Sequence, residues 1–516
     1  PRKNISLLQG KPLIAHVIKN ALKSDLITDL YVSTDDEEIF EIASLYGANV
    51  VNRPKNLADD KTPLDPVIYQ CVEEVEENNK IRYDFVITLQ PTCPLLSTKS
   101  LDEAIRVVIE NDYDTLISVI DETHLYWTKK NEQFIHLYES RKNRQYLDPI
   151  YKETGAIVIS KRDVITSKSR FGENVFLFEL PKQESIDIDH YNDWWIAEHL
   201  LNKKRILFRV DGDTDIGMGH VYRAITLAKR LVFNHDVVFL MEQSKKLGIS
   251  KVEEFHFNII TYKKEEDALK KILEIDPDIV INDVLDTETS YVETLKKNNF
   301  FVVNFEDFGR GADAADIVIN GIYENSHPHQ NHFYGYKYIC LRDEFYIFPK
   351  KTVQKKVTRI LCTFGGTDPN NLTMKTLQAI EQMNNKNIFY SVILGLGSTK
   401  KDEVKQYASK LKENGFSVEV KENVSMMAKE MYNADIVITS NGRTVYEVAS
   451  VGTPCISIAQ NEREAMHLFV HNSKCIKYLG MAVSLDLDKL ISVMEELIDD
   501  YTMRKEINQK LLKFDL

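Results

Sequence analysis

Short runs of β-branched and aromatic residues alternate with amphipathic helical stretches along almost all of this 516-residue chain. In the first 200 residues, strands are predicted at 30–34, 84–90, 115–120, 155–160 and 175–180, and helices at 37–47, 66–79 and 101–112. Strands that alternate with helices are typical of βαβ units, because a crossover helix lets the next strand run in the same direction. We therefore predict an α/β fold whose sheets are mainly parallel and carry helices on both faces.

This alternating pattern restarts twice, each time with a strand, a glycine loop and a helix. The first restart is ILFRVDGD (206–213) and the second is ILCTFGG (360–366). A chain of this length exceeds what one hydrophobic core usually serves. We predict three α/β units, the last two being facing Rossmann-like halves with a cleft between them. The units are 1–203, 206–348 and 357–516.

Composition excludes several classes of protein. The net charge of −13 argues against a dedicated nucleic-acid binder, which is usually basic, although a few local cations suffice to bind a nucleotide. No apolar stretch is long enough to span a bilayer. The six cysteines lie far apart and contain no C-x-x-C, a pattern typical of free thiols in a reducing cytosol. We therefore expect a cytoplasmic protein that binds neither nucleic acid nor a membrane.

The first unit opens on a basic loop. Arg2, Lys3 and Asn4 lead to a tight turn at Gly10 and then to a helix. Cations beside a turn that enters a helix can hold phosphate oxygens. The alternative is a solvated basic segment without a ligand.

Two further places in this unit carry chemistry. The strand in VITLQPTCPLL (86–96) ends at Gln90, at the sheet edge where open α/β folds bind ligands. In SIDIDHYND (185–193), Asp187 and Asp189 alternate with isoleucines, which would put both carboxylates on one face of a strand. Close carboxylates repel unless a cation lies between them, and Mg²⁺ typically takes one or two carboxylates plus phosphates. The alternatives are a proline-rich strand end and a polar strand edge.

Together these places resemble a known family, the acylneuraminate (CMP-nonulosonate) cytidylyltransferases, over about residues 1–200. The matching stretches are PRKN (1–4), GKPLI (10–14), VSTDDEEI (32–39), NRP (52–54), LQPTCPL (89–95), ETGAI (153–157) and SIDID (185–189). The resemblance implies a Rossmann-like nucleotidyltransferase domain that joins a nine-carbon α-keto acid sugar to CMP, using CTP and Mg²⁺ and releasing pyrophosphate. It also implies site residues: for the nucleotide Lys3, Asn4 and Arg53, for the sugar Gln90 and Arg144, and for catalysis with the metal Asp187 and Asp189.

In that family a strand and an Arg/Gly/Ser/Lys loop stand ahead of the PRKN-like segment. We therefore expect the complete protein to have roughly 10–25 residues ahead of Pro1, with an Arg and a Gly/Ser-Lys turn. The alternative is a docking module that has lost its nucleotide loop and does not catalyse.

The strongest local motif is RVDGDTDIGMGHVYRAITLAKRL (209–231), at the start of the second unit. Its strand ends at Asp211, its loop contains Gly217 and Gly219, and His220 follows at the start of a helix. Glycines let a phosphate or a sugar approach the backbone, and a neutral imidazole is a usable general base. We predict that the glycines contact a nucleotide, Asp211 a sugar and His220 the reacting atoms. The alternative for His220 is packing of the turn.

Two loops of the third unit are candidate nucleotide contacts. FGGTDPNN (364–371) supplies a glycine turn, and SNGRTVYEVASVGTP (440–454) supplies a polar loop that opens a helix. The N-terminus of that helix can hold a diphosphate, and Glu447 one turn further can accept from both ribose hydroxyls. An ordinary surface charge is the alternative for Glu447. The predicted nucleotide contacts of this unit are Gly365, Gly366, Thr367, Ser440, Asn441, Gly442, Thr444 and Glu447.

These two units are similar to a second family, the UDP-sugar hydrolases of pseudaminic acid synthesis, over about residues 206–475. The matching stretches are IGMGHVYRAITLA (216–228), ADIVIN (315–320), LRDEF (341–345), FGGTDPNN (364–371) and the loop at 440–454. That family is related in fold to the peptidoglycan N-acetylglucosaminyltransferase, a two-Rossmann glycosyltransferase B (GT-B) fold. The resemblance implies that His220 activates water for attack at the anomeric carbon, releasing UDP. Where the family usually has Asp-His-Tyr this chain has Asn282 and Asp283, which leaves the sugar and the acceptor open.

The two resemblances belong to one pathway. We therefore expect a bifunctional enzyme of nonulosonic acid synthesis whose ligands are CTP, a nonulosonic acid and a UDP-sugar. The main alternative is a UDP-sugar glycosyltransferase in the second and third units. Cytidylyltransferases of this type are often dimers, so the resemblance also implies a homodimer.

Overall fold

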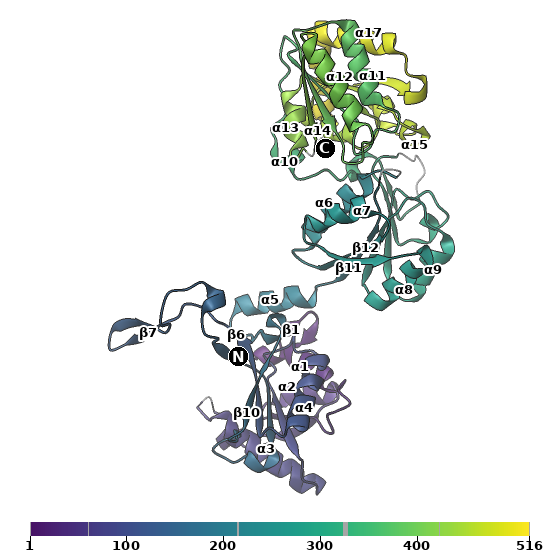
Figure 1. Ribbon diagram of the computed structural model, residues 1–516. Coiled ribbons are helices and arrows are strands. Elements are labelled where there is room, and N and C mark those ends of the chain that lie inside the picture. Colours follow the sequence, from purple (N-terminus) through teal and green to yellow (C-terminus); the bar gives the residue numbers. More distant parts are fainter. Residues whose placement is uncertain (1, 60, 214–215, 324–328, 423, 515) are drawn as a thin grey trace. The chain divides into compact units, whose positions relative to one another are not determined.

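The computed structural model describes residues 2–59, 61–213, 216–323, 329–422, 424–514 and 516. They form two compact units, Pro1–Lys203 (unit 1) and Lys204–Leu516 (unit 2), which are described in turn (Figure 1).

Unit 1 is built around a four-stranded sheet with the order β10-β6-β9-β5. Strands β6 (Thr115–Asp121) and β10 (Val175–Glu179) are parallel, whereas β9 (Tyr151–Lys161) runs antiparallel to both β6 and β5 (Phe85–Leu89). The expectation of a mainly parallel arrangement is therefore wrong for this sheet. No α-helix separates β6 from β9, so the chain returns without a crossover and the strands pair antiparallel.

Helices cover both faces of this sheet. Helix α4 (Thr98–Asn111) packs on one face, where its Leu101 and Ile105 join a buried cluster with β6 and β9. Helix α3 (Leu64–Asn79) packs Ile68 and Val72 against Val86 of β5 on the other face. The remaining helices of the unit are α1 (Leu13–Ala21), α2 (Glu37–Leu45) and α5 (Tyr191–Leu201).

Two short strand pairs complete the core of unit 1. Strands β3 (Tyr31–Thr34) and β4 (Asn49–Asn52) are parallel and flank α2. Strands β1 (Leu7–Leu8) and β2 (Lys11–Pro12) form a hairpin whose central residues Gln9 and Gly10 both have positive φ, 48° and 71°. That conformation is typical of the two-residue type I′ turn and carries the chain from the opening loop into α1.

A second hairpin, β7 (Trp127–Lys130) and β8 (Gln133–His136), stands away from the rest of unit 1 (Figure 1). All eight of its strand residues are exposed. They include Trp127, 53% exposed, and Phe134, 72% exposed. Apolar groups of this size are usually covered in a soluble protein, so this hairpin is a candidate contact surface.

Unit 2 contains two fully parallel sheets. The first has the order β13-β12-β11-β14-β15-β16-β17. Its strands are β11 (Arg205–Val210), β12 (Asp236–Glu242), β13 (Asn258–Tyr262), β14 (Ile279–Asp283), β15 (Phe301–Phe305), β16 (Ile317–Asn320) and β17 (His332–Tyr334). Helices α6 (Gly219–Leu231) and α7 (Lys246–Glu253) cover one face, and α8 (Glu265–Ile275) and α9 (Thr289–Lys297) cover the other (Figure 1).

The second sheet has the order β20-β19-β18-β21-β22-β23. Its strands are β18 (Arg359–Thr363), β19 (Phe389–Leu394), β20 (Ser417–Glu422), β21 (Ile436–Ser440), β22 (Cys455–Ala459) and β23 (Lys477–Met481). The helices of this half are α11 (Leu372–Met383), α12 (Lys401–Glu413), α13 (Met427–Asn433), α14 (Thr444–Val451), α15 (Glu462–Ala465), α16 (Phe469–Ser473), α17 (Leu487–Asp499) and α18 (Tyr501–Leu511). The prediction of an α/β fold with two Rossmann-like, GT-B-like halves is confirmed.

The strand order of both sheets fixes where ligands can bind. Counted from the first strand of each half, the second sheet follows 3-2-1-4-5-6, the order of doubly wound nucleotide-binding folds, and the first sheet follows the same order with a seventh strand at its edge. The order reverses between β11 and β14 in the first half and between β18 and β21 in the second. Ligands bind outside the carboxyl ends of the strands at these reversal points.

The two halves of unit 2 are joined by the segment around α10 (Glu344–Ile347). Ile322, Leu341 and Phe345 belong to the hydrophobic core of the second half. The Tyr446 hydroxyl of α14 donates to the carbonyl of Ile322 at 3.1 Å. Among the described residues, no helix combines the length and the apolar character needed to cross a bilayer.

Candidate functional sites

The opening loop of unit 1 meets the SIDID segment. The Lys3 ammonium donates to the carbonyl of Ile188 and lies 3.5 Å from Oδ1 of Asp189. The N–H of Ile188 donates to the carbonyl of Thr92 at 2.9 Å. Three stretches that are far apart in the sequence, the predicted phosphate loop, the QPTC turn and the aspartate segment, therefore lie together.

The segment Ile186–Asp189 is not a strand of a described sheet, so that part of the sequence interpretation is wrong. It follows a short turn and is held at Ile188 by one backbone hydrogen bond. The predicted alternation is nevertheless present, because Ile186 and Ile188 pack against Leu8 and Leu13. The isoleucines alone fix the direction of the aspartates.

The carboxylates of this segment suit a divalent cation. Oδ1 of Asp187 is buried and has no hydrogen-bond partner among the described residues, while Asp189 is exposed. A buried carboxylate oxygen without a partner is costly unless a cation or water reaches it. Two carboxylates are enough for Mg²⁺ when substrate phosphates supply the other ligands.

Gln90 directly follows β5 and packs against Gly155 of β9. A Cβ on Gly155, whose φ is +70°, would lie 2.7 Å from Oε1 of Gln90. Cys93, three residues later, is buried beside the aspartates: burial and then the charge of Asp187 raise the pKa of its thiol to about 12. The Cys93 thiol is therefore inert, and Gln90 is the polar group that this turn offers to a ligand.

The other predicted contacts of unit 1 are Arg53, Asn4 and Arg144. Arg53 directly follows β4, and its guanidinium donates to the carbonyl of Ser33 in β3 at 2.7 Å, so it stands at the carboxyl ends of this strand pair. Asn4 lies in the same turn as Lys3. Arg144 is exposed and comes after the β7–β8 hairpin, and no contact of the described structure joins it to Gln90.

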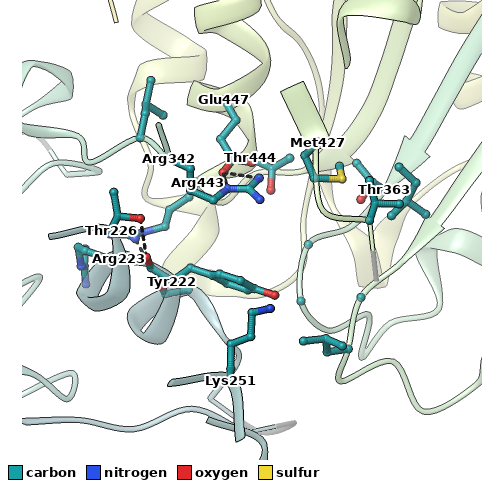
Figure 2. Close-up of a pocket in the computed structure, with 18 of the residues that line it drawn as sticks. Tyr222, Arg223, Thr226, Lys251, Arg342, Thr363, Met427, Arg443, Thr444 and Glu447 are labelled. Carbon is teal, nitrogen blue, oxygen red and sulfur yellow. Dashed lines mark hydrogen bonds and ion pairs between the residues drawn. The ribbon is translucent and has the colours of Figure 1, made fainter. Parts of the chain in front are cut away.

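In unit 2 a cavity of about 390 Å³ opens between α6 of the first half and the loops of the second (Figure 2). The predicted residues that line it are Gly219, Gly365, Gly366, Thr444 and Glu447. The end of β18, at the reversal point of the second half, lines it through Thr363, and the first half contributes α6, which follows the loop after β11.

The glycine turns allow the two halves to approach closely. A Cβ on Gly366 would lie 3.1 Å from Cβ of Met218, in the glycine loop of the other half. A Cβ on Gly365, whose φ is +79°, would lie 3.9 Å from the hydroxyls of Ser440 and Thr444. The glycine turn after β18 and the N-terminus of α14 thus form one wall of the cavity, where backbone N–H groups can hold a phosphate.

Asn441 in this wall has a structural function. Its side chain donates to the carbonyl of Glu464 at 2.8 Å and accepts from the Ser457 hydroxyl at 3.0 Å, and its N–H donates to the carbonyl of Ile458. These bonds hold the loop, and the predicted nucleotide contact of Asn441 stays a prediction. Gly442, the next residue, packs over the carboxylate of Glu464.

Glu447 lines the cavity and is held by an arginine from the segment between the halves. Nε and Nη2 of Arg342 both lie 3.1 Å from Oε1 of Glu447. Burial opposes the charge of Arg342, but Glu447 and Glu344 outweigh it and raise its pKa. One carboxylate oxygen of Glu447 is thus occupied, and the side chain is oriented at the wall of the cavity.

His220 lies in the first turn of α6, between Gly219 and Arg223, which both line the cavity. Its Nδ1 is hydrogen-bonded to Oδ1 of Asp283 at the end of β14. Arg223 donates to both oxygens of the same carboxylate, with Nε 2.6 Å from Oδ2. Although burial opposes it, the charge of Arg223 and then that of His220 lower the pKa of Asp283 well below its usual range, so this carboxylate is ionised.

The ionised carboxylate fixes the tautomer of His220. A carboxylate oxygen can only accept, so Nδ1 carries the proton and donates it to Asp283, the shorter of its two contacts; Nη2 of Arg223 lies 3.2 Å from the same nitrogen. The opposite tautomer would place the lone pair of Nδ1 against an acceptor. In the neutral imidazole Nε2 is then the nitrogen without a proton, which is the form a general base needs.

Asp211 does not line this cavity, although the sequence predicts it as a sugar contact. It is buried, and its two oxygens accept from the N–H of Glu242 at 2.7 Å and from the hydroxyl of Tyr262 at 2.9 Å. Asp211 therefore ties the carboxyl ends of three adjacent strands together. Gly217 adopts a φ of +82° in the loop before α6, and Thr367 follows the glycine turn of the second half.

The sequence does not identify Asp283 as the partner of His220, since it marks this residue only as a departure from the hydrolase pattern. The strand order contains the missing signal, because β14 pairs directly with β11 and its last residue must lie beside the loop that follows β11.

Comparisons with known proteins support this division of the chain. Residues 1–200 match the cytidylyltransferase family, and residues 360–513 match the glycosyltransferase family 28 C-terminal domain. A pseudaminic acid cytidylyltransferase of Campylobacter jejuni is 32% identical over 227 residues, which are 42% of this chain and 92% of that relative.

Two further relatives cover other parts of the chain. The uncharacterized protein MJ1062 of Methanocaldococcus jannaschii is 32% identical over 273 residues, which are 50% of this chain but only 56% of the length of that relative. The spore coat polysaccharide biosynthesis protein SpsG of Bacillus subtilis is 26% identical over 320 residues, 58% of this chain and 90% of the relative. The chain therefore belongs, through residues 1–200, to the cytidylyltransferase family, and it carries a C-terminal domain like that of glycosyltransferase family 28.

Proposed function

We propose that this protein catalyses two steps of nonulosonic acid synthesis. Unit 1 transfers CMP from CTP to a nonulosonic acid of the pseudaminic, legionaminic or sialic type. Unit 2 hydrolyses a UDP-2,4-diacetamido-trideoxy-hexose to the free sugar and UDP. Membership of the cytidylyltransferase family supports the first activity. The observation that carries the second is the Asp283–His220 pair beside a cavity of ligand size.

In unit 1 the anomeric hydroxyl of the nonulosonic acid attacks the α-phosphorus of CTP, and the bond to pyrophosphate breaks. Lys3 and Asn4 would contact the phosphates, and the charge of Lys3 offsets the charge that develops on the leaving pyrophosphate. Gln90 would orient the sugar. Mg²⁺, held by Asp187 and Asp189, would supply further neutralisation of the phosphate charge.

In unit 2, Nε2 of His220 accepts a proton from water as the water oxygen attacks the anomeric carbon, and the bond from that carbon to UDP breaks. Asp283 holds the imidazole through Nδ1–H and stabilises the cation that forms. The N-terminus of α14 and Thr444 would hold the diphosphate, and Glu447 would accept from the ribose.

The two reactions form a coherent sequence. The sugar that unit 2 frees is the substrate class that a separate synthase condenses with phosphoenolpyruvate to give a nonulosonic acid. Unit 1 then activates that acid as its CMP derivative. One chain would therefore carry the step before and the step after a reaction of another enzyme.

Glycosyl transfer is the second candidate activity for unit 2, because residues 360–513 match a glycosyltransferase domain. Nε2 of His220 could deprotonate a sugar hydroxyl instead of water. The test is to incubate the protein with the UDP-sugar, with and without acceptor sugars, and to follow free sugar and UDP. Free sugar without any acceptor supports hydrolysis, whereas consumption that depends on an acceptor would overturn it.

A non-catalytic docking function is the alternative for unit 1. Calorimetric titration of the full chain with CTP and Mg²⁺ separates the two. We expect CTP to bind and the Lys3→Ala variant to bind it about tenfold more weakly, since one charge-assisted contact is lost. The matched control is His220→Ala in unit 2, which should leave CTP affinity unchanged. Absence of CTP binding would favour the docking module.

We also propose a cytosolic homodimer. The exposed β7–β8 hairpin, with Trp127 and Phe134 on it, supports pairing with a second copy, and all six cysteines are free thiols, as a reducing compartment favours. Analytical ultracentrifugation should give a dimer for the wild-type chain and a monomer for Phe134→Ser combined with Trp127→Ser. A monomeric wild-type protein would contradict the dimer.

A further inference from the structure

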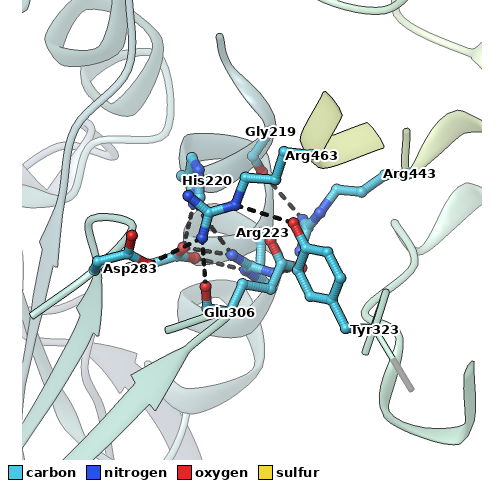
Figure 3. Close-up of polar contacts among 9 residues, drawn as sticks. Gly219, His220, Arg223, Asp283, Glu306, Tyr323, Arg443 and Arg463 are labelled. Atoms are coloured by element: carbon cyan, nitrogen blue, oxygen red, sulfur yellow. Dashed lines mark hydrogen bonds and ion pairs between the residues drawn. The ribbon is translucent and has the colours of Figure 1, made fainter. Parts of the chain in front are cut away.

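A chain of buried charges connects the nucleotide loop of the second half with His220 in the first half (Figure 3). It begins at Arg443, between Gly442 and Thr444 in the predicted diphosphate loop. The Arg443 guanidinium donates to Oε1 of Glu306 at 3.2 Å and to the carbonyl of Gly219 at 3.0 Å. Both acceptors belong to the first half, and Gly219 is the residue directly before His220.

The chain continues through Glu306 to the catalytic pair. Oε1 of Glu306 also accepts from Nη1 of Arg223, and Arg223 donates to both oxygens of Asp283. Asp283 in turn orients His220. Because each of these contacts is direct, a displacement of Glu306 shifts Arg223 and Asp283 and, through them, His220.

These side chains are buried almost completely and balance one another in charge. Glu306 is 6% exposed, Arg223 2% and Asp283 1%. Burial alone would raise the pKa of Glu306, but Arg223 and Arg443 outweigh it and lower that pKa to about 2. Arg223, Asp283 and Glu306 are thus held together where solvent screens them little, and Arg443 reaches Glu306 from the wall of the cavity. Any group that competes for one of the cations changes the field on the rest.

A bound nucleotide would be such a competitor, because Arg443 lines the cavity as well as bonding to Glu306. We propose that Arg443 is a positioning residue that couples nucleotide binding in the second half to the orientation of His220 in the first half. The inference rests on the proposed UDP-sugar chemistry of unit 2. A diphosphate in the cavity draws the guanidinium of Arg443 away from Glu306. Glu306 then pairs with Arg223 alone, and Arg223, held in place by this pair, holds Asp283 more firmly.

Reciprocity gives this coupling a signature that a purely structural contact lacks. If the diphosphate and Glu306 compete for Arg443, then weakening the Glu306 contact must favour nucleotide binding by the same factor. Glu306→Gln keeps the shape and the hydrogen-bond acceptor but removes the charge. We expect this variant to bind UDP about 3–10-fold more tightly, while kcat for UDP release falls about 10–100-fold because Arg223 and Asp283 are held less firmly.

The experiment measures UDP affinity by calorimetry, and kcat and KM for release of UDP from the UDP-sugar, on the full chain. Arg443→Gln should weaken UDP binding without the fall in kcat expected for Glu306→Gln, because Glu306 then pairs with Arg223 alone even without nucleotide, and Arg443→Lys should restore part of the UDP affinity. The matched control is Arg463→Gln. Arg463 joins the halves at the same place, but its guanidinium donates to the backbone carbonyl of Glu306, at 3.0 Å, and not to the carboxylate. This control should change UDP affinity and kcat by less than about twofold.

A second readout tests whether Glu306 acts through His220. In a His220→Ala background, Glu306→Gln should cause no further loss of residual activity, because residues that act as one unit are not additive. Weaker UDP binding in Glu306→Gln, or a further loss in the His220→Ala background, would overturn the coupling. If the wild-type chain turns over no UDP-sugar, the proposed hydrolysis is wrong, and this result alone does not decide the coupling. The opposite changes in UDP affinity expected for Glu306→Gln and Arg443→Gln would still test the coupling.

Discussion

Replacing Glu464 with glutamine should stabilise unit 2 at pH 8 and leave it nearly unchanged near pH 4. Glu464 lies in α15, beneath the predicted diphosphate loop, where a Cβ on Gly442 would lie 3.2 Å from its Oε1. Its other oxygen accepts from the N–H of Gln460 at 2.8 Å. No ion pair of the described residues involves Glu464, and burial raises its pKa to about 7 despite this hydrogen bond.

The magnitude follows from the difference between the two states. The ordinary pKa of a glutamate is 4.5, and in the folded chain that of Glu464 is about 7. Between these values the unfolded chain releases the proton before the folded chain does, so folded stability falls as the pH rises and stays lower above pH 7. The full difference corresponds to about 3 kcal/mol. Because the side chain is only partly buried, we expect about 1–3 kcal/mol.

Glutamine keeps the acceptor for Gln460 and carries no charge, so the variant should escape this loss. The assay is the melting temperature of the full chain and of Glu464→Gln between pH 4 and 8.5. The variant should melt about 2–6 °C higher at pH 8, and this gain should vanish toward pH 4.5. Burial lowers the pKa of nearby His467 to about 4, so this histidine destabilises the fold as the pH falls from 6.5 toward 4, which is the opposite pH dependence to that of Glu464. His467 is present in both proteins, so its contribution cancels in the difference between their melting temperatures. A difference that is independent of pH, or a variant less stable at pH 8, would refute the reasoning.

Three further changes probe the two sites. Asp283→Asn should lower UDP release about 10²–10⁴-fold, because His220 loses the anion that fixes its tautomer, while CMP transfer stays unchanged; normal UDP release would count against the assigned base. Gly155→Ala puts a Cβ 2.7 Å from Oε1 of Gln90, so KM for the nonulosonic acid should rise about tenfold in a pyrophosphate-release assay, and an unchanged KM would remove Gln90 from the sugar site. Asp187→Asn should raise the Mg²⁺ concentration for half-maximal CMP transfer about tenfold or more, and an unaltered Mg²⁺ titration would contradict the metal assignment.

Much of unit 2 could be predicted from the sequence because its signals are local. Each half begins with a strand, a glycine loop and a helix, and these elements are set by residues close together in the chain. The positions of Gly219, Gly365 and Thr444 around one cavity follow from the rule that ligands bind at the carboxyl ends of parallel strands.

The direction of β9 could not be predicted in the same way. Its residues have the composition of a buried strand, but whether it runs parallel depends on what precedes it. Here the chain forms the β7–β8 hairpin instead of a crossover helix, and the hairpin sequence resembles an ordinary loop.

Polar residues at strand ends posed the other difficulty. Asp211 and Asn441 stand at positions where ligand contacts are common, yet their side chains hold neighbouring strands and loops. Asp283 stands at an equivalent position and orients His220. Only the side-chain partners distinguish these cases, and the partners named here lie 23 residues away for Asn441, 51 for Asp211 and 63 for Asp283.

Mass spectrometry of the reaction products tests the proposal of two activities most directly. The full chain is incubated with CTP, Mg²⁺ and a nonulosonic acid, and separately with the UDP-sugar and no acceptor. We expect CMP-nonulosonate and pyrophosphate in the first reaction, and free sugar and UDP in the second. The His220→Ala variant should abolish the second reaction alone. A chain that forms no CMP product, or that consumes the UDP-sugar only when an acceptor is present, would contradict the account.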